Sequence, residues 1–203
     1  MSITEDVPPR EILLFLASGF DDLEAVAILE VCGWTAYRPH LAPVRVVTAG
    51  FHREVRGRFG TTFRVDLLVD EIAQPVRFAA LALPGGFDSH GYQEVYDARL
   101  YAFARAIHAN GGPIATMCVG ALPIAEAGLL QGRRATTYAF SRSQDRRARL
   151  SELGALTTSG PIEFDGGVIS CSGPAHAVQA ALVLMEQLVG RETAEEIRGF
   201  LHC

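Results

Sequence analysis

The chain has 203 residues, of which 49% are hydrophobic and 20% charged, a composition typical of a globular protein, and we expect one domain over residues 1–203. The net charge is −5 and all 18 basic residues are arginines, which argues against a nucleic-acid partner and excludes lysine Schiff-base chemistry. The longest apolar runs are too short to span a bilayer, and the four cysteines form no C-x-x-C pair, so we expect a cytoplasmic protein without a membrane partner.

The first part of the chain predicts a strand, a helix, a second strand and a hairpin. An apolar run at 12–17 is followed by a Ser-Gly turn and then by apolar residues at helical spacing. Asp21 and Asp22 indicate where this helix begins, because acidic residues are favoured at the N-cap and in the first turn. A second strand is predicted at 44–50, and the glycines and short alternating stretches of 51–72 favour a hairpin.

The middle of the chain predicts two further strand-to-helix units. A buried strand at 77–86 runs into a double glycine, and a helix is expected from Glu94 to Asn110. The short strand at 113–118 ends at a cysteine, after which the apolar spacing is helical as far as Gly128.

The last part predicts a turn and strand at 164–173, a long helix around 175–190 and a terminal helix at 191–202. Continuous apolar strands that alternate with helices indicate a parallel sheet covered on both faces. In such sheets ligands bind where the carboxyl ends of the strands meet the following loops. The three loops expected to carry the site are therefore 18–24, 84–91 and 117–121.

Cys118 lies between a strand and a helix with Gly120 just after it, which is the context of a nucleophile elbow. Unpaired amides and the dipole at the start of the helix would lower its pKa. The alternative is a buried, inert thiol, since free cysteines are often core residues. We interpret Cys32, Cys171 and Cys203 as non-catalytic.

Glu24 lies near the start of the first helix, close to the predicted edge of the sheet. A protonated carboxyl group there would donate a hydrogen bond to the thiolate of Cys118 and would have a raised pKa of its own. The alternative is a solvated acid that complements the helix dipole, as Asp21 and Asp22 do.

The double glycine in LPGGFD would let the backbone approach a ligand closely, with the amides of Gly86 and Val119 directed at an oxyanion. None of the six histidines adjoins the cysteine, but His90 and His176 lie in loops from which they could reach it. No histidine or cysteine cluster has the spacing of a metal site, so none is predicted.

Taken together and in this order, ILLFLASGFDDLEA, LALPGG, ATMCVGALPIAEAGLLQGRRATTY and VISCSGPAHA resemble the ThiJ/PfpI superfamily, also called the Parkinson-linked deglycase family. The resemblance spans nearly the whole chain. It implies a flavodoxin-like three-layer α/β/α sandwich with a mostly parallel sheet, similar to class I glutamine amidotransferase domains, and usually a homodimer. It also implies that Cys118 is the nucleophile, that Glu24 is its protonated partner, and that Gly86 and Val119 supply the oxyanion amides.

The chain departs from the family pattern at two positions. Protease-like and large glyoxalase members carry a histidine directly after the cysteine, where this chain has Val119, and deglycase-like members carry one after the threonine pair, where it has Tyr138. Tyr138 can donate a hydrogen bond but is ordinarily a poor base at neutral pH. The accessory candidates are Gly85, Tyr138, His90 and His176.

The first functional hypothesis is a cysteine-dependent enzyme that acts on small reactive carbonyl compounds, with glyoxalase III-like or deglycase-like chemistry and no cofactor. The second is a redox sensor or stress-response protein that works through oxidation of Cys118 without turnover. An amidase or peptidase is a third hypothesis, disfavoured by Val119.

Overall fold

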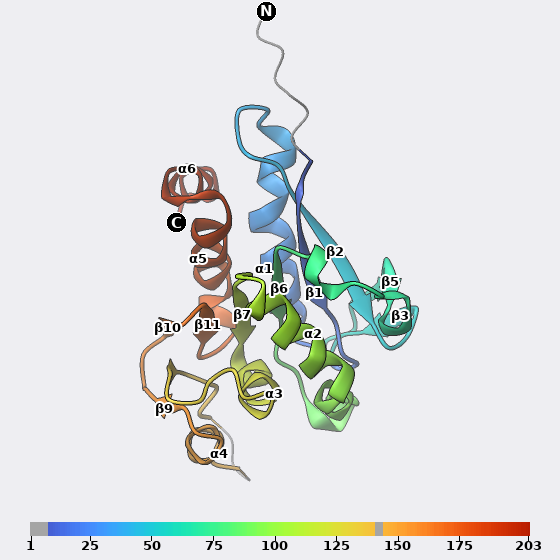
Figure 1. Ribbon diagram of the computed structural model, residues 1–203, viewed down its shortest axis with the longest axis vertical. Coiled ribbons are helices and arrows are strands. Elements are labelled where there is room, and N and C mark those ends of the chain that lie inside the picture. The colour runs from blue at the N-terminus through green and yellow to red at the C-terminus, as the bar shows by residue number, and fades with distance from the viewer. Residues whose placement is uncertain (1–7, 141–143) are drawn as a thin grey trace, which may run out of the picture.

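The computed structural model describes residues 8–140 and 144–203. Its centre is a seven-stranded sheet in which all neighbouring strands are parallel except the pair β10 and β11 (Figure 1). Across the sheet the order is β10 (Ile162–Asp165), β11 (Val168–Cys171), β7 (Ile114–Met117), β6 (Ala80–Leu83), β1 (Arg10–Phe15), β2 (Val44–Gly50) and β5 (Leu67–Leu68). The mostly parallel sheet predicted from the sequence is therefore confirmed.

Helices cover both faces of this sheet. One face carries α1 (Asp22–Gly33) and α5 (Ala177–Val189), with α6 (Arg191–Leu201) packed on α5. The other carries α2 (Ala98–Ala109) and α3 (Ala121–Glu126), and α4 (Arg146–Glu152) packs against α3. Within the described ranges, no helix is both long enough and apolar enough to cross a membrane.

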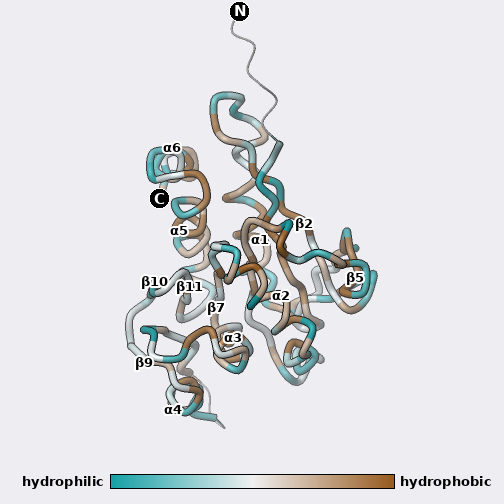
Figure 2. Tube along the Cα trace, viewed as in Figure 1, coloured by the Kyte–Doolittle hydropathy of each residue, from teal (hydrophilic) through white to brown (hydrophobic). Residues whose placement is uncertain are grey.

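The central strands β1 and β6 are buried on both faces along most of their length because their apolar residues are continuous. In β1, Ile12 and Leu14 belong to the hydrophobic cluster under α1 and α5, whereas Leu13 and Phe15 belong to the cluster under α2 and α3. Side chains alternate between the faces of a strand, so only an uninterrupted apolar run fills both layers. Figure 2 shows the hydrophobic segments gathered along the strands and the hydrophilic ones on the outer loops.

The predicted hairpin is present as β3 (Glu54–Arg56) and β4 (Thr62–Arg64). Its tip docks on the loop after β1, because the Asp22 carboxylate accepts hydrogen bonds from the backbone N–H groups of Phe59 and Thr61, both at 2.9 Å. A further short parallel pair joins β8 (Arg134–Ala135) to β9 (Leu156–Thr157).

One predicted helix boundary is wrong. The segment expected to be helical from Glu94 begins with a 3₁₀ turn over Tyr92–Tyr96, and α2 starts only at Ala98. Asp97 is the N-cap, and its side chain accepts a hydrogen bond from the Arg99 N–H at 2.8 Å. Glu94 contacts a distant loop instead, accepting from the Ser18 N–H at 2.6 Å, and this tertiary bond outweighs its helix propensity.

Candidate active site

The candidate site lies at the carboxyl ends of β1, β6 and β7, the three central strands. The loops that follow these strands pack directly on one another. Phe20 and Gly86 form an antiparallel bridge, flanked by hydrogen bonds from Asp21 N–H to the Gly85 carbonyl at 2.7 Å and from Phe87 N–H to the Gly19 carbonyl at 3.0 Å. These contacts hold the predicted loop 18–24 against the predicted loop 84–91.

Cys118 occupies the sharp turn between β7 and α3 in a strained backbone conformation. Its φ is 52°, a value that non-glycine residues rarely adopt, and its side chain is buried with 4% of the residue exposed. Thr137 supports the turn from the chain segment after β8, because its Oγ1 donates a hydrogen bond to the Cys118 carbonyl at 2.8 Å. The predicted strand, turn and helix around the cysteine are thus present.

Glycines allow the backbone to pass close to Cys118. A Cβ added at Gly85 would lie 2.7 Å from the Cys118 Cβ, and one added at Gly120 would lie 2.7 Å from the Leu83 carbonyl oxygen. A side chain at either position would push the cysteine turn away from β6. The sequence pattern of glycines therefore reflects close packing of two strand ends.

Gly86 is required by a buried tyrosine. A Cβ at this position would lie 2.1 Å from Cδ2 of Tyr92, whose hydroxyl donates a hydrogen bond to the Pro84 carbonyl at 2.6 Å. Tyr92 therefore packs against the turn formed by Pro84, Gly85 and Gly86 and fixes its position. The amide of Gly86 donates to no acceptor in residues 8–140 and 144–203, so it is available to a ligand.

Glu24 is completely buried on the first turn of α1. Its Oε2 accepts a hydrogen bond from the Gly85 N–H at 2.7 Å, while its Oε1 has no hydrogen-bond partner among the described residues. The hydrogen bond predicted between the Glu24 carboxyl group and the Cys118 sulfur is not formed. A protonated carboxyl group would carry its proton on Oε1, because Oε2 already accepts from a donor.

Burial dominates the electrostatics of this pair. It raises the pKa of Glu24 to about 8, and the charge of Asp21 adds to the shift. Burial also raises the pKa of the Cys118 thiol well above its ordinary value, and the charge of Glu24 raises it further, against a lowering contribution from the Val119 amide. The predicted lowering by the helix N-terminus is therefore wrong, since α3 has only six residues and cannot offset the lost hydration.

A pocket of about 410 Å³ opens beside the cysteine. It brings together Cys118, Gly86, Val119 and Tyr138, all predicted as site residues. The described residues that line it are Gly86, Phe87, Asp88, Ser89, Cys118, Val119, Tyr138, Phe140, Gln144 and Arg146. Among the described residues, no three histidine, cysteine or acidic side chains are grouped so that they could hold a metal ion.

The two predicted accessory histidines do not line this pocket. His90 is exposed, contacts Ser89 Oγ at 3.0 Å and lines a separate cavity beside the hairpin tip. His176 lies in the 3₁₀ turn that precedes α5. The position after the threonine pair is filled by Tyr138, whose ring makes an edge contact with Phe140.

Three contributors have no signal in the sequence. Tyr92 and Thr137 brace the two turns through hydrogen bonds to carbonyl groups, and their role depends on contacts between distant segments. Arg58, at the hairpin tip, lies 4.0 Å from the centre of the Phe87 ring, with its Nε 3.5 Å from the Asp21 carboxylate. Its charge lowers the pKa of Glu24, in opposition to burial.

The fold and the site define a class of protein: an α/β sandwich with a cysteine in a left-handed turn at the carboxyl edge of its sheet, next to a buried acid. The chain belongs to the DJ-1/PfpI family, whose model matches residues 10–187. The family predicted from the sequence is therefore confirmed.

Individual relatives agree with this assignment. The chain is 29% identical over 165 residues to a deglycase from Thermococcus kodakarensis, covering 81% of this chain and 90% of that protein. It is 27% identical over 194 residues to protein DJ-1 homolog A of Arabidopsis thaliana, covering 95% of this chain but only 46% of that longer relative. The crystal structure of Drosophila melanogaster DJ-1beta matches with a TM-score of 0.81 at 21% identity, covering 96% of this chain and 98% of that one.

Proposed function

We propose that the protein is a cysteine-dependent enzyme that acts on small reactive carbonyl compounds, with glyoxalase III-like or deglycase-like chemistry. The observation that carries the proposal is the position of Cys118, in a left-handed turn at a pocket that also contains the free amide of Gly86. A relative named as a deglycase, 29% identical over 165 residues, supports the same reading.

In the proposed reaction the Cys118 sulfur adds to an aldehyde or ketone carbon. A carbon–sulfur bond forms, the carbonyl π bond opens onto oxygen, and the thiol proton passes to Glu24, which returns a proton to that oxygen to give a hemithioacetal. The amides of Gly86 and Val119 stabilise the developing oxyanion. With methylglyoxal, the hydrogen on the hemithioacetal carbon then moves as a proton to the neighbouring carbonyl carbon, which leaves a thioester, and water hydrolyses the thioester to lactate and the free Cys118 thiol. The reaction sequence is an internal redox reaction plus one water, so it consumes no external oxidant or reductant and needs no cofactor.

Protonation of Glu24 and Cys118 has to be treated as one equilibrium. Both groups have raised pKa values, so at neutral pH the pair is mainly uncharged, and the reactive form has lost one proton shared between them. We assign Tyr138 the role of a hydrogen-bond donor to the substrate, because a phenol is ordinarily protonated at pH 7.

Turnover of methylglyoxal tests the proposal. Purified protein is expected to form lactate, Cys118→Ser to abolish the activity, and Cys32→Ser to retain it, since Cys32 is a buried residue of α1 outside the pocket. Wild-type protein that forms no lactate, or a Cys118→Ser variant that does, would contradict the glyoxalase reaction.

A redox role is the second candidate, favoured by the replacement of both customary histidines by Val119 and Tyr138. Here peroxide would oxidise the Cys118 thiolate to sulfenic or sulfinic acid without turnover. Intact mass after mild peroxide would then show oxygen added to Cys118 before Cys203, the exposed cysteine. An amidase or peptidase gains no support, since Val119 offers no base.

We also propose a homodimer formed through α1 and a cytoplasmic location. Leu23 and Val26 on α1 are 54% and 43% exposed, although the opposite side of the helix is buried in the core. Exposed apolar side chains on a helix whose other side is already buried favour a second apolar partner. Sedimentation of wild type against Val26→Glu tests the dimer, which should dissociate in the variant.

The proposed cytoplasmic location is supported by the cysteines. All four are free, as expected of a protein in a reducing compartment.

A further inference from the structure

Among its described lining residues, the pocket beside Cys118 has one of each charge. Asp88 belongs to the wall that follows β6, and Arg146 is the first residue of α4, on the wall that follows Tyr138 and Phe140. The position of Arg146 is set by its neighbour Asp145, the N-cap of α4, which accepts a hydrogen bond from the Ala148 N–H at 2.9 Å. The guanidinium is therefore carried by an ordered turn.

Arg146 has no ion-pair partner among the described residues, in contrast to Arg149 and Arg58. Arg149 contacts Glu126 at 3.2 Å, and Arg58 lies 3.5 Å from Asp21. The Nε of Arg146 is fully buried and has no hydrogen-bond acceptor in residues 8–140 and 144–203. Since Arg146 lines the pocket and no described carboxylate pairs with it, its guanidinium can bind an anionic group there.

The other ionisable groups around the pocket decide how large this preference is. Glu24 is mainly protonated at neutral pH, since burial raises its pKa to about 8. Tyr96, near both Asp88 and Arg146, is neutral because burial raises its pKa to about 12. Among the described lining residues, the Asp88 carboxylate alone opposes an anion, and it forms no ion pair with any described residue.

We infer that Arg146 binds the anionic group of the substrate, and that the substrates are small carbonyl compounds that carry a carboxylate. A guanidinium holds a carboxylate with two parallel hydrogen bonds, which fixes the orientation as well as the affinity of the ligand. A pocket of about 410 Å³ accommodates both ends of a molecule of a few carbons, with its carbonyl carbon at Cys118. This inference rests on the proposed function and specifies its substrate class.

Arg146 binds the substrate and takes no part in making or breaking bonds. When the Cys118 sulfur adds to the aldehyde carbon, one carbon–sulfur bond forms, the carbonyl oxygen gains a proton, and the carboxylate at Arg146 is unchanged. The residue should therefore control which carbonyl compounds occupy the pocket, while the intrinsic reactivity of the thiol depends on Glu24 and the backbone amides.

Protection of Cys118 from alkylation tests the inference without requiring turnover. The rate of iodoacetamide labelling, followed by peptide mass, is measured with succinic semialdehyde or with butanal, which share a four-carbon aldehyde and differ in the carboxylate. Glyoxylate against acetaldehyde provides a shorter pair. We expect the acid of at least one pair to protect wild-type protein at about tenfold lower concentration than its neutral counterpart.

Variants assign the preference to Arg146. Arg146→Met should remove it and Arg146→Lys should keep part of it. Arg147→Met is the matched control, because the Nε of Arg147 is also buried without a partner but the residue does not line the pocket. Asp88→Asn should strengthen the preference by removing the opposing charge. The melting temperature of each variant reports whether it is folded.

Two outcomes would overturn the inference: no preference for the acids in wild type, or an equal preference in Arg146→Met and Arg147→Met. Both outcomes can be distinguished from a failure of the proposed catalytic function. A protein that shows the preference but converts no carbonyl compound would refute the enzymatic reaction and leave the anion-binding residue in place.

Discussion

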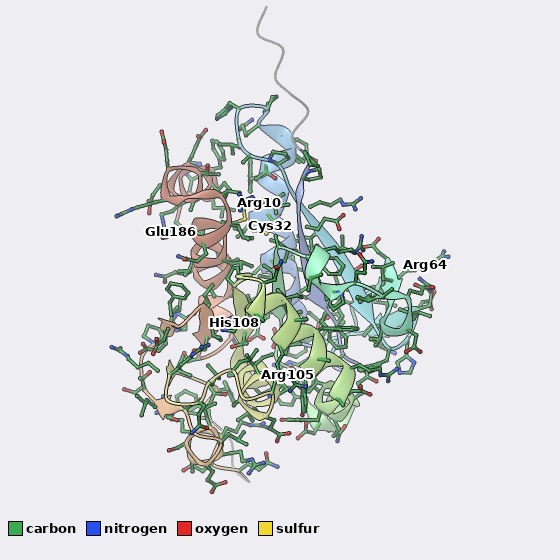
Figure 3. The ribbon with its side chains drawn as sticks, viewed as in Figure 1. Arg10, Cys32, Arg64, Arg105, His108 and Glu186 are labelled. Carbon is green, nitrogen blue, oxygen red and sulfur yellow. The ribbon has the colours of Figure 1, made fainter. Side chains whose placement is uncertain are left out.

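The two ends of the central sheet have opposite characters. At the amino end, Arg133 donates hydrogen bonds to the Leu129 carbonyl at 2.9 Å and to His108 at 3.0 Å. Figure 3 shows His108 on α2. At the carboxyl end, one carboxylate oxygen of Glu24 has no hydrogen-bond partner among the described residues, and Cys118 has a left-handed backbone. The Arg133 cluster at the amino end is satisfied and stabilises the fold, whereas at the carboxyl end Glu24 carries an oxygen that a proton or a ligand would satisfy.

A tightly packed glycine lies at each end of the sheet, Gly86 at the carboxyl end and Gly112 at the amino end. Substituting the first should mainly reduce activity, and substituting the second should mainly reduce stability. We expect this to be the largest difference between the two ends. Gly86→Ala forces a Cβ into the Tyr92 ring at 2.1 Å and displaces an oxyanion amide, so we expect about a 100-fold loss of activity. Gly112→Ala at the amino end meets Ile107 and the Ala79 carbonyl oxygen at 2.7 and 2.8 Å. It should cost about 1–3 kcal/mol of stability and leave the specific activity unchanged.

Denaturant unfolding and methylglyoxal turnover of the two variants provide the measurement. Gly199→Ala serves as a control, because no atom lies within 4 Å of the added Cβ. Equal losses of activity in Gly86→Ala and Gly112→Ala would remove the functional distinction between the two ends.

Glu24→Gln should change both the pH dependence of stability and the reactivity of the thiol. The pKa of Glu24 is about 8 in the folded state against an ordinary 4.5, so the folded protein binds the proton more tightly than the unfolded chain. Wild-type stability should therefore fall as the pH rises from 4.5 to 8, by about 1.4 kcal/mol for each pKa unit of difference. The variant lacks this loss and should be several kcal/mol more stable than wild type at pH 8.

The same substitution should speed alkylation of Cys118 at pH 8, because it removes the charge of Glu24, which raises the pKa of the thiol. Urea unfolding at pH 5 and pH 8 and iodoacetamide labelling between pH 6 and 10 measure the two effects. A labelling profile identical to that of wild type would exclude Glu24 from the site.

Thr137→Val tests whether the strained turn at Cys118 depends on its hydrogen bond from the Thr137 hydroxyl. The substitution removes the hydrogen bond to the Cys118 carbonyl, and we expect a loss of about 1 kcal/mol of stability and a several-fold lower kcat. Thr157→Val, whose hydroxyl makes a long bond of 3.4 Å to the Arg147 carbonyl away from the pocket, is the comparison. An unchanged kcat in Thr137→Val would show that the turn holds its shape alone.

His108→Gln should have the smallest effect and should appear only as a pH dependence of stability. Burial and the charge of Arg133 lower the pKa of His108 below its ordinary 6.5. Below pH 6.5 the unfolded chain therefore binds more protons, and wild-type stability is lost as the pH falls through the folded-state pKa. The variant should lose less stability in acid and retain full activity, as thermal unfolding between pH 5 and 8 would show.

The sequence predicted most of the elements because local patterns decide them. The helix start at Asp21 was predicted from capping chemistry, and this side chain does accept a hydrogen bond from the Glu24 N–H. The hairpin and the cysteine turn followed from glycine positions and apolar periodicity. The start of α2 was missed because Glu94 is engaged by Ser18, 76 residues away.

The candidate site was only partly predictable. Cys118, Gly86 and Val119 lie at turns that the sequence marks, so their common location follows from the strand order. The contributions of Tyr92, Arg58 and Arg146 depend on loops that meet only in the folded chain. No periodicity distinguishes Arg146 from the arginine that follows it, although only the first lines the pocket.

By itself the sequence determined the alternation of apolar strands and helices, the reversal of the chain at the cysteine and the glycines that permit it, because these depend on residues that are neighbours along the chain. Only the tertiary structure decided the protonation of the site. Glu24 and Asp22 are both acids of the first turn of α1, yet the pKa of Asp22 is lowered, since hydrogen bonds from Thr61 and Phe59 outweigh its burial, while that of Glu24 is raised. Solvation and long-range contacts set this difference, and neither is encoded in the local sequence.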